Sequence, residues 1–465
     1  MRKDPGKVLI IGGGPTGLGA ACRLEELGFS DFLVLEADER TGGLSKSYLD
    51  SKGFTWDLGG HVQFSHYRYY DGVLDEALKD RWLWHERESW VWLKNRFIPY
   101  PLQNNIHYLD DGDLRRALAG LEQAASRRAC EPPPGNFRDW VIRTFGQGLA
   151  QLFLLPYNYK VWGYPLETLS WHWIGDRVSV PDIERIRETI RTRRDDVCWG
   201  PNSRFRFPEK GGTGAIWEAV TRRINPARLS LGSVIVGVDL DRRCIRLSDG
   251  RAFGYDTLLT TMPLDRFVLI ADRLPAALKT KARELTHGSV HLLGFGLRGG
   301  RPDTLAKKCW MYFPEENSPY YRVTVFSNYS PNNTPEGHWS LMAEVSETRH
   351  RKVHPGRIAG ECLGSLRRDG LLERDADTTS VWTMRLEHAY PTPTIGRDDA
   401  LEALQGELER RRVFSRGRFG GWKYEVGNQD HCFMQGVEWA NRVIAGEPEV
   451  TYASPETISR SGSPR

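Results

Sequence analysis

The chain has 465 residues, of which 40% are hydrophobic and 27% charged, a composition typical of globular proteins with two or three domains at this length. Lys and Arg number 64 and Asp and Glu 60, a formal charge of +4, which argues against a dedicated nucleic-acid binder because such proteins concentrate basic residues on one face. The sequence contains no run of about 18 apolar residues, so we expect no transmembrane helix. The seven cysteines are scattered without a CxxC pair. We therefore expect no disulfide framework, no metal site and a cytoplasmic location.

The N-terminal region predicts a βαβ unit. A buried strand is expected at 8–11, a helix at 18–27 and a second buried strand at 31–36, all within about 30 residues. The remaining expected elements, in chain order, are a helix at 66–80, short strands at 86–103, a helix at 112–129, a break at 131–136, a helical region from 137 to about 194, short strands to about 275, alternating strands across 290–346 and a frayed tail after Ser454.

The first motif is a glycine-rich turn between the first strand and the first helix. Gly12 allows a tight turn, Gly14 lets the backbone approach a pyrophosphate, and Gly17 allows the helix to pack closely on the strand. Glu36 ends the second strand, 19 residues after Gly17, where an acid that binds a ribose is expected. Together these residues predict a dinucleotide site.

Two further glycine motifs extend this site. Residues 39–44 (ERTGGL) and 57–61 (DLGGH) carry glycine pairs that let backbone lie against a cofactor. The first resembles the flavoprotein pattern of the amine oxidase and protoporphyrinogen oxidase superfamily, which changes the expected cofactor from NAD to FAD. Residues 416–430 (RGRFGGWKYEVGNQD) precede an expected helix and are interpreted as returning to the same cofactor.

Longer stretches, in order along nearly the whole chain, resemble the eukaryotic-type UDP-galactopyranose mutase family. They are GGHVQFSHYRYYD (59–71), IPYPLQNNI (98–106), PYNYKVWGYP (156–165), WIGDRV (173–178), WGPNSRFRFPEKGGTGAIW (199–217), CWMYFPEENSPYYRVTVFSNYSP (309–331), YPTPT (390–394) and SRGRFGGWKYEVGNQDH (415–431).

The resemblance implies an α/β fold: an FAD-binding Rossmann-type domain with an inserted helical bundle and an antiparallel β-sheet domain. The expected divisions are 1–85 with 198–275 and 386–455 for the FAD domain, 105–197 for the helical domain with its flaps and uridine pocket, 86–104 with 276–385 for the antiparallel sheet, and 456–465 for a flexible tail. Segments 174–182 and 198–204 match mobile flaps that close over substrate.

The implied reaction interconverts UDP-galactopyranose and UDP-galactofuranose without net redox change. No Ser-His-Asp, Cys-His or metal-ligand constellation is placed for it, and no conspicuous acidic pair lies in the matched motifs. In the family the reduced flavin N5 attacks the anomeric carbon and forms a covalent adduct. The expected cofactors are therefore FAD, active when reduced, and NADPH as its reductant, with a UDP-sugar as the partner.

The resemblance also implies residue roles, each carried over from a matching motif. Arg177 and Arg322 are expected to bind the diphosphate, and His61 to contact the flavin. The expected substrate residues are Gln103, Phe153, Tyr157, Asn158, Trp162, Asn202, Trp310, Tyr312, Tyr329, Tyr390 and Tyr424. The expected FAD residues are Gly12, Gly14, Thr16, Gly17, Glu36, Gly43, Leu44, Gly60, His61, Gly427, Asn428 and Gln429. The expected NADPH residues are Arg87, Ser89, Tyr100 and Arg418.

Two other enzyme classes stay open at this stage. One is a mutase that acts on a related nucleotide sugar, and the other is an FAD-dependent oxidase or dehydrogenase of the amine oxidase superfamily. A protein that only binds FAD or a nucleotide sugar is a third alternative, which the full set of aromatic, amide and arginine positions disfavours. Self-association into a homo-oligomer is compatible with the sequence.

Overall fold

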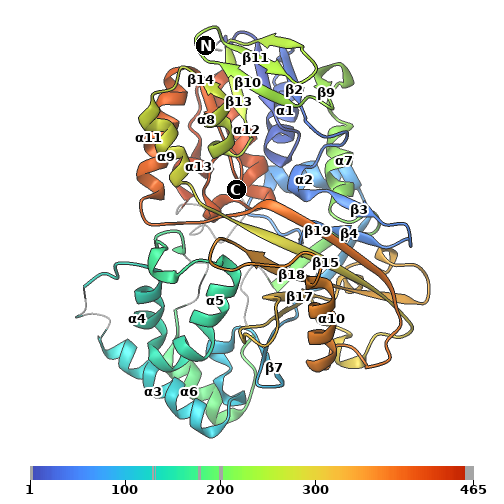
Figure 1. Ribbon diagram of the computed structural model, residues 1–465, viewed down its shortest axis with the longest axis vertical. Coiled ribbons are helices and arrows are strands. Elements are labelled where there is room, and N and C mark those ends of the chain that lie inside the picture. Colours follow the sequence, from blue (N-terminus) through green and yellow to red (C-terminus); the bar gives the residue numbers. More distant parts are fainter. Residues whose placement is uncertain are drawn as a thin grey trace.

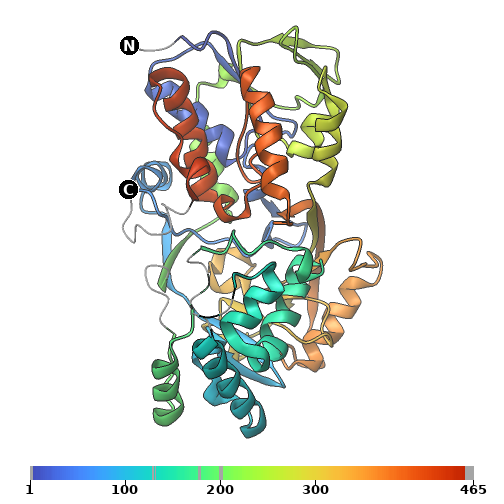
Figure 2. The ribbon, with the colours of Figure 1, turned by 90° about the vertical axis from the view of Figure 1, so that its left-hand side faces the viewer.

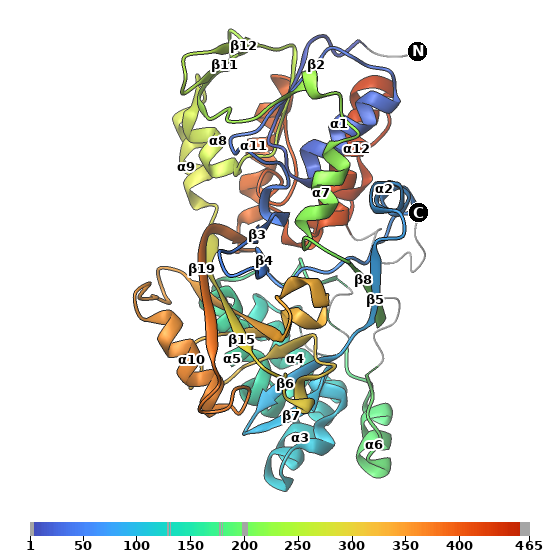
Figure 3. The same cartoon turned by 90° about the vertical axis from the view of Figure 1, so that its right-hand side faces the viewer.

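The computed structural model describes residues 4–127, 130, 132–175, 178, 180–197 and 203–455. Figure 1 shows an upper lobe built around a parallel sheet and a lower part in which a group of helices lies beside a second, larger sheet. The long strands β15 and β19 run from the junction of the two parts into the larger sheet (Figures 1 and 3). This mixed α/β architecture agrees with the fold expected from the sequence.

The upper lobe is organised by five parallel strands in the order β20-β13-β1-β2-β9. They are β1 (Val8–Ile11), β2 (Phe32–Leu35), β9 (Leu229–Ser230), β13 (Thr257–Thr260) and β20 (Val413–Ser415). The central strands are apolar and buried, as expected where helices cover both faces of a sheet. On one face α1 (Pro15–Glu26) packs so closely on α12 (Gln429–Ala445) that a Cβ at Gly436 would lie 2.0 Å from the Thr16 carbonyl oxygen.

The rest of the upper lobe surrounds this sheet. A four-stranded sheet has the order β12-β11-β10-β14. Helices, seen along their length in Figure 2, cover the lobe. The strands are β10 (Ile235–Asp239), β11 (Cys244–Leu247), β12 (Ala252–Gly254) and β14 (Ala271–Asp272). The helices are α2 (Arg68–Leu78), α7 (Gly214–Thr221), α8 (Leu264–Ile270), α9 (Ala276–Glu284), α11 (Arg397–Arg410) and α13 (Val450–Ala453). Helices α7 and α8 correct the sequence analysis, which expected only strands there.

The lower part contains a seven-stranded sheet in the order β19-β15-β18-β17-β16-β6-β7. Its strands are β6 (Ser89–Leu93), β7 (Arg96–Pro99), β15 (His287–Arg298), β16 (Trp310–Tyr312), β17 (Arg322–Thr324), β18 (His338–Glu347) and β19 (Thr378–Pro391), with α10 (Ile358–Arg368) packed against it. All neighbours are antiparallel except β6 and β16, which are parallel. The boundary expected between 385 and 386 falls inside β19, because this strand pairs with β15 over the whole length of β15.

The helical part of the lower lobe contains α3 (Asp111–Arg127), α4 (Phe137–Leu149), a π-helical turn (Ala150–Leu154), α5 (Leu155–Trp162) and α6 (Ile183–Thr192). The helical region expected from 137 to about 194 is therefore interrupted between α5 and α6. Gly163 ends α5 in the left-handed conformation, with φ 67°, which glycine adopts at little cost.

Two short ribbons join the lobes. The strands β3 (Ser47–Leu49) and β4 (Thr55–Asp57) form one ribbon, and β5 (Trp82–Glu86) and β8 (Arg204–Pro208) form the other, visible at the right of Figure 3. The expected boundary at 85–86 falls inside β5. Within the described ranges no helix combines the length and the apolar character that a membrane crossing needs, and the six cysteines that lie there are free.

Candidate active site

A cavity of about 810 Å³ lies between the two lobes. Its wall begins at the carboxyl ends of β1, β2 and β13, the edge where open parallel sheets bind ligands. It continues past the glycines before β5 to the larger sheet, where it ends at Trp310, Arg322 and Glu344. The loop after β20 and the first turn of α12 close the remaining side.

The glycine-rich turn lies at the β1 end of this cavity. Gly12 and Gly14 line the wall, and Gly12 has φ 99°. A Cβ at Gly17 would lie 1.9 Å from the Gly12 carbonyl oxygen, so this glycine serves the packing of α1 on β1 and does not line the cavity. Glu36 is buried and its Oε2 accepts a hydrogen bond from the Gly13 amide at 2.5 Å. The acid predicted at the end of β2 thus faces the glycine turn.

Twelve residues were predicted to bind FAD, and eleven of them line the cavity; Gly17 is the exception. The eleven are Gly12, Gly14, Thr16, Glu36, Gly43, Leu44, Gly60, His61, Gly427, Asn428 and Gln429. Within this wall the two glycine motifs lie backbone to backbone, since the Cα of Gly43 would lie 3.7 Å from a Cβ at Gly14. Such a cradle of glycines suits a dinucleotide such as FAD.

The Gly59–His61 segment is held on both sides. The Gly60 amide donates to Glu344 Oε1 at 3.3 Å, and Trp310 Nε1 donates to the Gly60 carbonyl at 3.2 Å. A Cβ at Gly60 would lie 2.8 Å from both Thr324 Oγ1 and Trp310 Nε1, so only glycine fits. These contacts fix the position of His61 in the cavity wall.

His61 is neutral at physiological pH. Its pKa is lowered to about 4, chiefly by burial, with Arg418 and Arg322 adding to the lowering and Glu344 opposing it. Its Nδ1 has no hydrogen-bond partner among the described residues. A buried ring nitrogen without a partner fits a site where a ligand or cofactor supplies one.

Arg322 is paired with a buried glutamate. Its Nε and Nη2 donate to Glu344 Oε1 and Oε2 at 2.7 and 2.8 Å, a bidentate ion pair across β17 and β18. Tyr321 donates to the same carboxylate at 2.7 Å. Burial alone would raise the pKa of Glu344, but Arg322 and Tyr321 hold it below its usual value. The Nη1 group takes no part in this pair and can donate to a ligand in the cavity.

Aromatic side chains form the wall near Arg322. Trp310, Tyr390 and Tyr424 line the cavity, and behind them Trp162 of α5 packs edge-on against Tyr424, with ring centroids 4.9 Å apart. A second group continues from there: Phe153 stacks on Tyr157, Tyr157 packs on Tyr312, and Tyr312 packs on Tyr100. The structure thus brings together, in one aromatic region, residues predicted for substrate and for NADPH.

Arg418 lies in the cavity wall beside the same tyrosines. Its guanidinium carbon is 5.2 Å from the Tyr390 ring centroid and 5.7 Å from that of Tyr424. Its hydrogen bonds go to the carbonyl oxygens of Ala389 and Gly427, and no carboxylate pairs with it in the described part of the chain. This cation therefore keeps a positive field at the cavity.

Other predicted residues lie behind the wall. Gln103 is buried and its Oε1 has no partner among the described residues, Asn158 donates to the Leu154 carbonyl, and the Arg87 guanidinium lies 4.8 Å from the Trp310 ring. Ser89 is buried on β6, directly across from Trp310 on β16. Tyr329 is buried among Phe205, Phe207 and Trp310 and is not part of the cavity wall.

Two predictions cannot be followed in the structure. Arg177 and Asn202 lie outside the described residues, as do parts of both segments expected to be flaps, 174–182 and 198–204.

The sequence analysis missed Glu344 and the group around Asp430. Glu344 is a buried acid within the mostly buried strand β18. An acid in such a strand is visible in the sequence and could have marked it as a candidate. Asp430, at the start of α12, accepts from His66 Nδ1 at 2.8 Å and lies 3.0 Å from His431 Nδ1. Gln63 and Trp217 both donate to Gln429 Oε1 at 2.9 Å. These contacts hold the first turn of α12 against the cavity.

Comparison with known proteins agrees with this geometry. The family model described as flavin containing amine oxidoreductase matches residues 15–444. The chain belongs to this family. A solved structure described as a reduced UDP-galactopyranose mutase is similar over 99% of this chain and 98% of its own, with 44% identity and a TM-score of 0.96.

Solved structures of lower identity are also similar in fold. A putative protoporphyrinogen oxidase from Exiguobacterium sp. 255-15 has 16% identity and a TM-score of 0.72, with 95% of this chain and 99% of the other covered. A putrescine oxidase bound to putrescine has 14% identity and a TM-score of 0.66, with 94% and 98% covered. At these identities the likeness concerns the fold. The family membership supports FAD as the cofactor of the cavity.

Proposed function

We propose that this protein is a flavin-dependent isomerase of the eukaryotic type that interconverts UDP-galactopyranose and UDP-galactofuranose without net redox change. The observation that carries the proposal is the 44% identity, over 99% of the chain, to a reduced UDP-galactopyranose mutase. The oxidases of the same fold are only 14 to 16% identical.

The residues of the cavity fit an FAD. The glycine turn and Glu36 suit the adenosine and pyrophosphate, and the wall at Gly59, Gly60 and His61 is where the flat ring system would lie against the backbone. Once bound and reduced, the flavin would supply through its N5 atom the nucleophile for the anomeric carbon. The protein would supply binding, orientation and charge.

Arg322 would bind the diphosphate of the substrate through Nη1. Glu344 holds the guanidinium in place through the other edge, so that the clamp is oriented before substrate arrives. A positioned cation stabilises negative charge on the departing diphosphate and keeps it near for recombination. Arg177 is the proposed second arginine, and Tyr312, Tyr390 and Tyr424 the proposed hydroxyl donors. Gln103, Phe153, Tyr157 and Asn158 are the proposed uridine pocket.

NADPH is the proposed reductant. Arg87 lies against the Trp310 ring and Tyr100 packs on Tyr312, while Arg418 lies in the cavity wall beside Tyr390 and Tyr424 with no described carboxylate paired with it. Positive charge beside these aromatic rings suits a phosphorylated dinucleotide.

An anaerobic assay with UDP-galactofuranose tests the proposal. The holoprotein is incubated with and without NADPH or dithionite, and the nucleotide sugars are separated by chromatography. We expect UDP-galactopyranose only when the flavin is reduced. A protein that binds and reduces its flavin but forms no isomer would refute the proposal. Oxidation of an amine with consumption of oxygen would instead identify an oxidase of the same family.

A further inference from the structure

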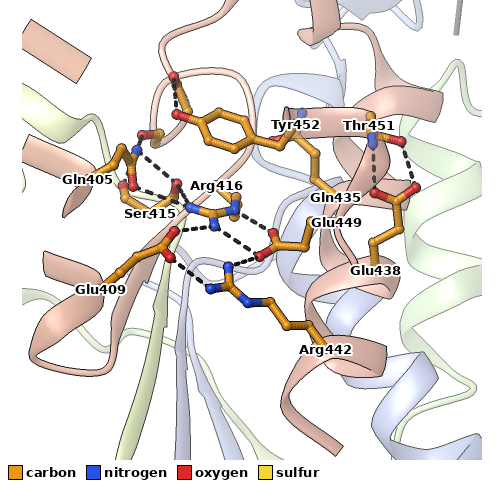
Figure 4. Close-up of polar contacts among 12 residues, drawn as sticks. Gln405, Glu409, Ser415, Arg416, Gln435, Glu438, Arg442, Glu449, Thr451 and Tyr452 are labelled. Carbon is orange, nitrogen blue, oxygen red and sulfur yellow. Dashed lines mark hydrogen bonds and ion pairs between the residues drawn. The ribbon is translucent and has the colours of Figure 1, made fainter. Parts of the chain in front are cut away.

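The loop between β20 and α12 brings residues to the cavity from one side and a buried arginine from the other. Gly417, Arg418, Phe419 and Tyr424 line the cavity. Arg416, the residue before them, points away from it and is only 2% exposed. Figure 4 shows its guanidinium enclosed by side chains of α11, of α12 and of the segment that follows α12.

Arg416 uses its whole guanidinium in this environment. Its Nε and Nη2 donate to the two oxygens of Glu449 at 2.5 and 2.9 Å, and Nη2 also donates to Glu409 at 2.6 Å. Its Nη1 donates to the Gln405 side chain and the Ser415 carbonyl. Arg442 of α12 bridges the same two acids at 2.6 and 2.9 Å, which closes a ring of two arginines and two glutamates (Figure 4).

The segment Glu449–Tyr452 contacts the 417–424 loop, α12 and Tyr67. The Tyr452 ring lies under the Arg416 guanidinium at 4.5 Å, and the carbonyl of the same residue accepts from Lys423 in the loop. Thr451 is anchored to Glu438 of α12 by two hydrogen bonds of 2.8 Å, and its hydroxyl lies 2.9 Å from that of Tyr67. Tyr67 follows the segment 59–64, which also lines the cavity.

The position of the loop matters to the cavity because Gly417, the residue after Arg416, packs directly against the start of α1. Gly417 has φ 88°, and a Cβ there would lie 2.5 Å from Thr16 Oγ1, at the start of α1. Its amide donates to Gln435 Oε1 at 2.8 Å. A shift of Arg416 is therefore transmitted to Gly417 and Arg418 and to the glycine turn beside Thr16, all of which line the cavity or adjoin it.

We propose that Glu449 and Arg416 are positioning residues for the flavin site: the C-terminal segment Glu449–Tyr452 holds the 417–424 loop in the geometry that binds the flavin, although Glu449 is not in the cavity wall. The proposal uses flavin binding by this family and does not depend on which substrate is turned over. The test therefore needs no nucleotide sugar.

The test compares purified holoproteins of the wild type, Glu449→Gln and Arg442→Gln. Glu449→Gln keeps the size of the side chain but removes the charge that both arginines share. Arg442→Gln keeps every contact of Arg416 while opening the ring at its partly exposed side. Glu407→Gln is the matched control, because Glu407 lies on the same helix as Glu409 and its ion pairs in the described part of the chain are with Arg410 and Arg411 near the surface.

The measured quantities are the rate of flavin release on dilution and the position and fine structure of the visible flavin absorption band. We expect Glu449→Gln to release flavin on the order of tenfold faster, which corresponds to about 1.4 kcal/mol, with a shifted band. Arg442→Gln should change both in the same direction by less, and Glu407→Gln should match the wild type. A lowered melting temperature with unchanged release and band would mean a purely structural role and overturn the proposal. Should Glu449→Gln not fold, a release rate and absorption band in Arg442→Gln equal to those of the wild type would overturn the proposal on their own.

Discussion

The pairing of Arg322 with Glu344 makes the proposed diphosphate clamp testable. Replacing Arg322 with alanine removes the Nη1 donor, but it also leaves Glu344 buried without its counter-ion. Loss of one partner of a buried pair costs about 3–5 kcal/mol of folding free energy. The informative variant is therefore the double substitution Arg322→Ala with Glu344→Gln, because the neutral amide can still accept from Tyr321 and needs no cation.

The expected loss of UDP affinity follows from the Nη1 group of Arg322, which the ion pair with Glu344 leaves available for the substrate. A hydrogen bond to a charged group contributes about 1.5–3 kcal/mol, which corresponds to a roughly 10- to 150-fold weaker Kd. Flavin content, followed by visible absorbance, should stay at the wild-type level. Calorimetric titration of the reduced holoprotein with UDP measures the Kd.

Arg385→Ala is the control for this prediction. Arg385 also donates to a glutamate, Glu347, on the neighbouring part of the same sheet, but it is 41% exposed and lies outside the cavity wall. Its loss should leave UDP affinity unchanged. UDP affinity equal to wild type in the double variant would refute the assignment of Arg322 as a diphosphate ligand.

Three further predictions concern the same cavity. Gly60→Ala should lower flavin affinity at least tenfold (about 1.4 kcal/mol), because the added Cβ lies 2.8 Å from Thr324 and Trp310; flavin content after gel filtration checks this, and full retention would contradict it. The folded pKa of His61, about 4, lies below its unfolded value, about 6.5, so the wild type should lose stability as pH falls from about 6.5 to 4. His61→Gln should lose less stability over that pH range, as melting temperatures measured at each pH can show, and equal losses in the two proteins would refute the pKa assignment. Arg87→Ala should slow flavin reduction by NADPH but leave the activity of dithionite-reduced enzyme intact, as stopped-flow and steady-state assays can show; a rate of flavin reduction by NADPH equal to that of the wild type would remove Arg87 from the NADPH site.

Local signals in the sequence singled out residues that the structure brings together in one cavity wall. The glycine turn, Glu36 and the glycine pairs are short motifs whose backbone demands are visible without a structure, and the family resemblance extended them to twelve residues, of which eleven line one cavity. Gly17 differs because its role is packing: the lack of a side chain serves the contact between α1 and β1.

Contacts between distant strands were not predictable in the same way. The Arg322–Glu344 pair depends on the register of β17 against β18, and the ribbon of β5 and β8 joins segments more than 100 residues apart. Neither register is encoded by a local pattern, because it follows from which faces the whole sheet buries. Helix α7 was missed for a related reason, since it is short and largely buried and so lacks a polar face at helical spacing. Helix α8 was missed because it spans only seven residues, of which three are buried, too few to establish a helical period.

The central claim is that the flavin acts without net redox change, and counting turnovers per electron pair tests it most directly. The holoprotein is reduced anaerobically with one equivalent of NADPH per flavin, excess UDP-galactofuranose is added, and the UDP-galactopyranose formed is counted against the NADPH consumed. Our account predicts many isomer molecules per flavin with no further NADPH oxidised. Product that forms only in step with NADPH consumption, or no product from a fully reduced flavin, would contradict it.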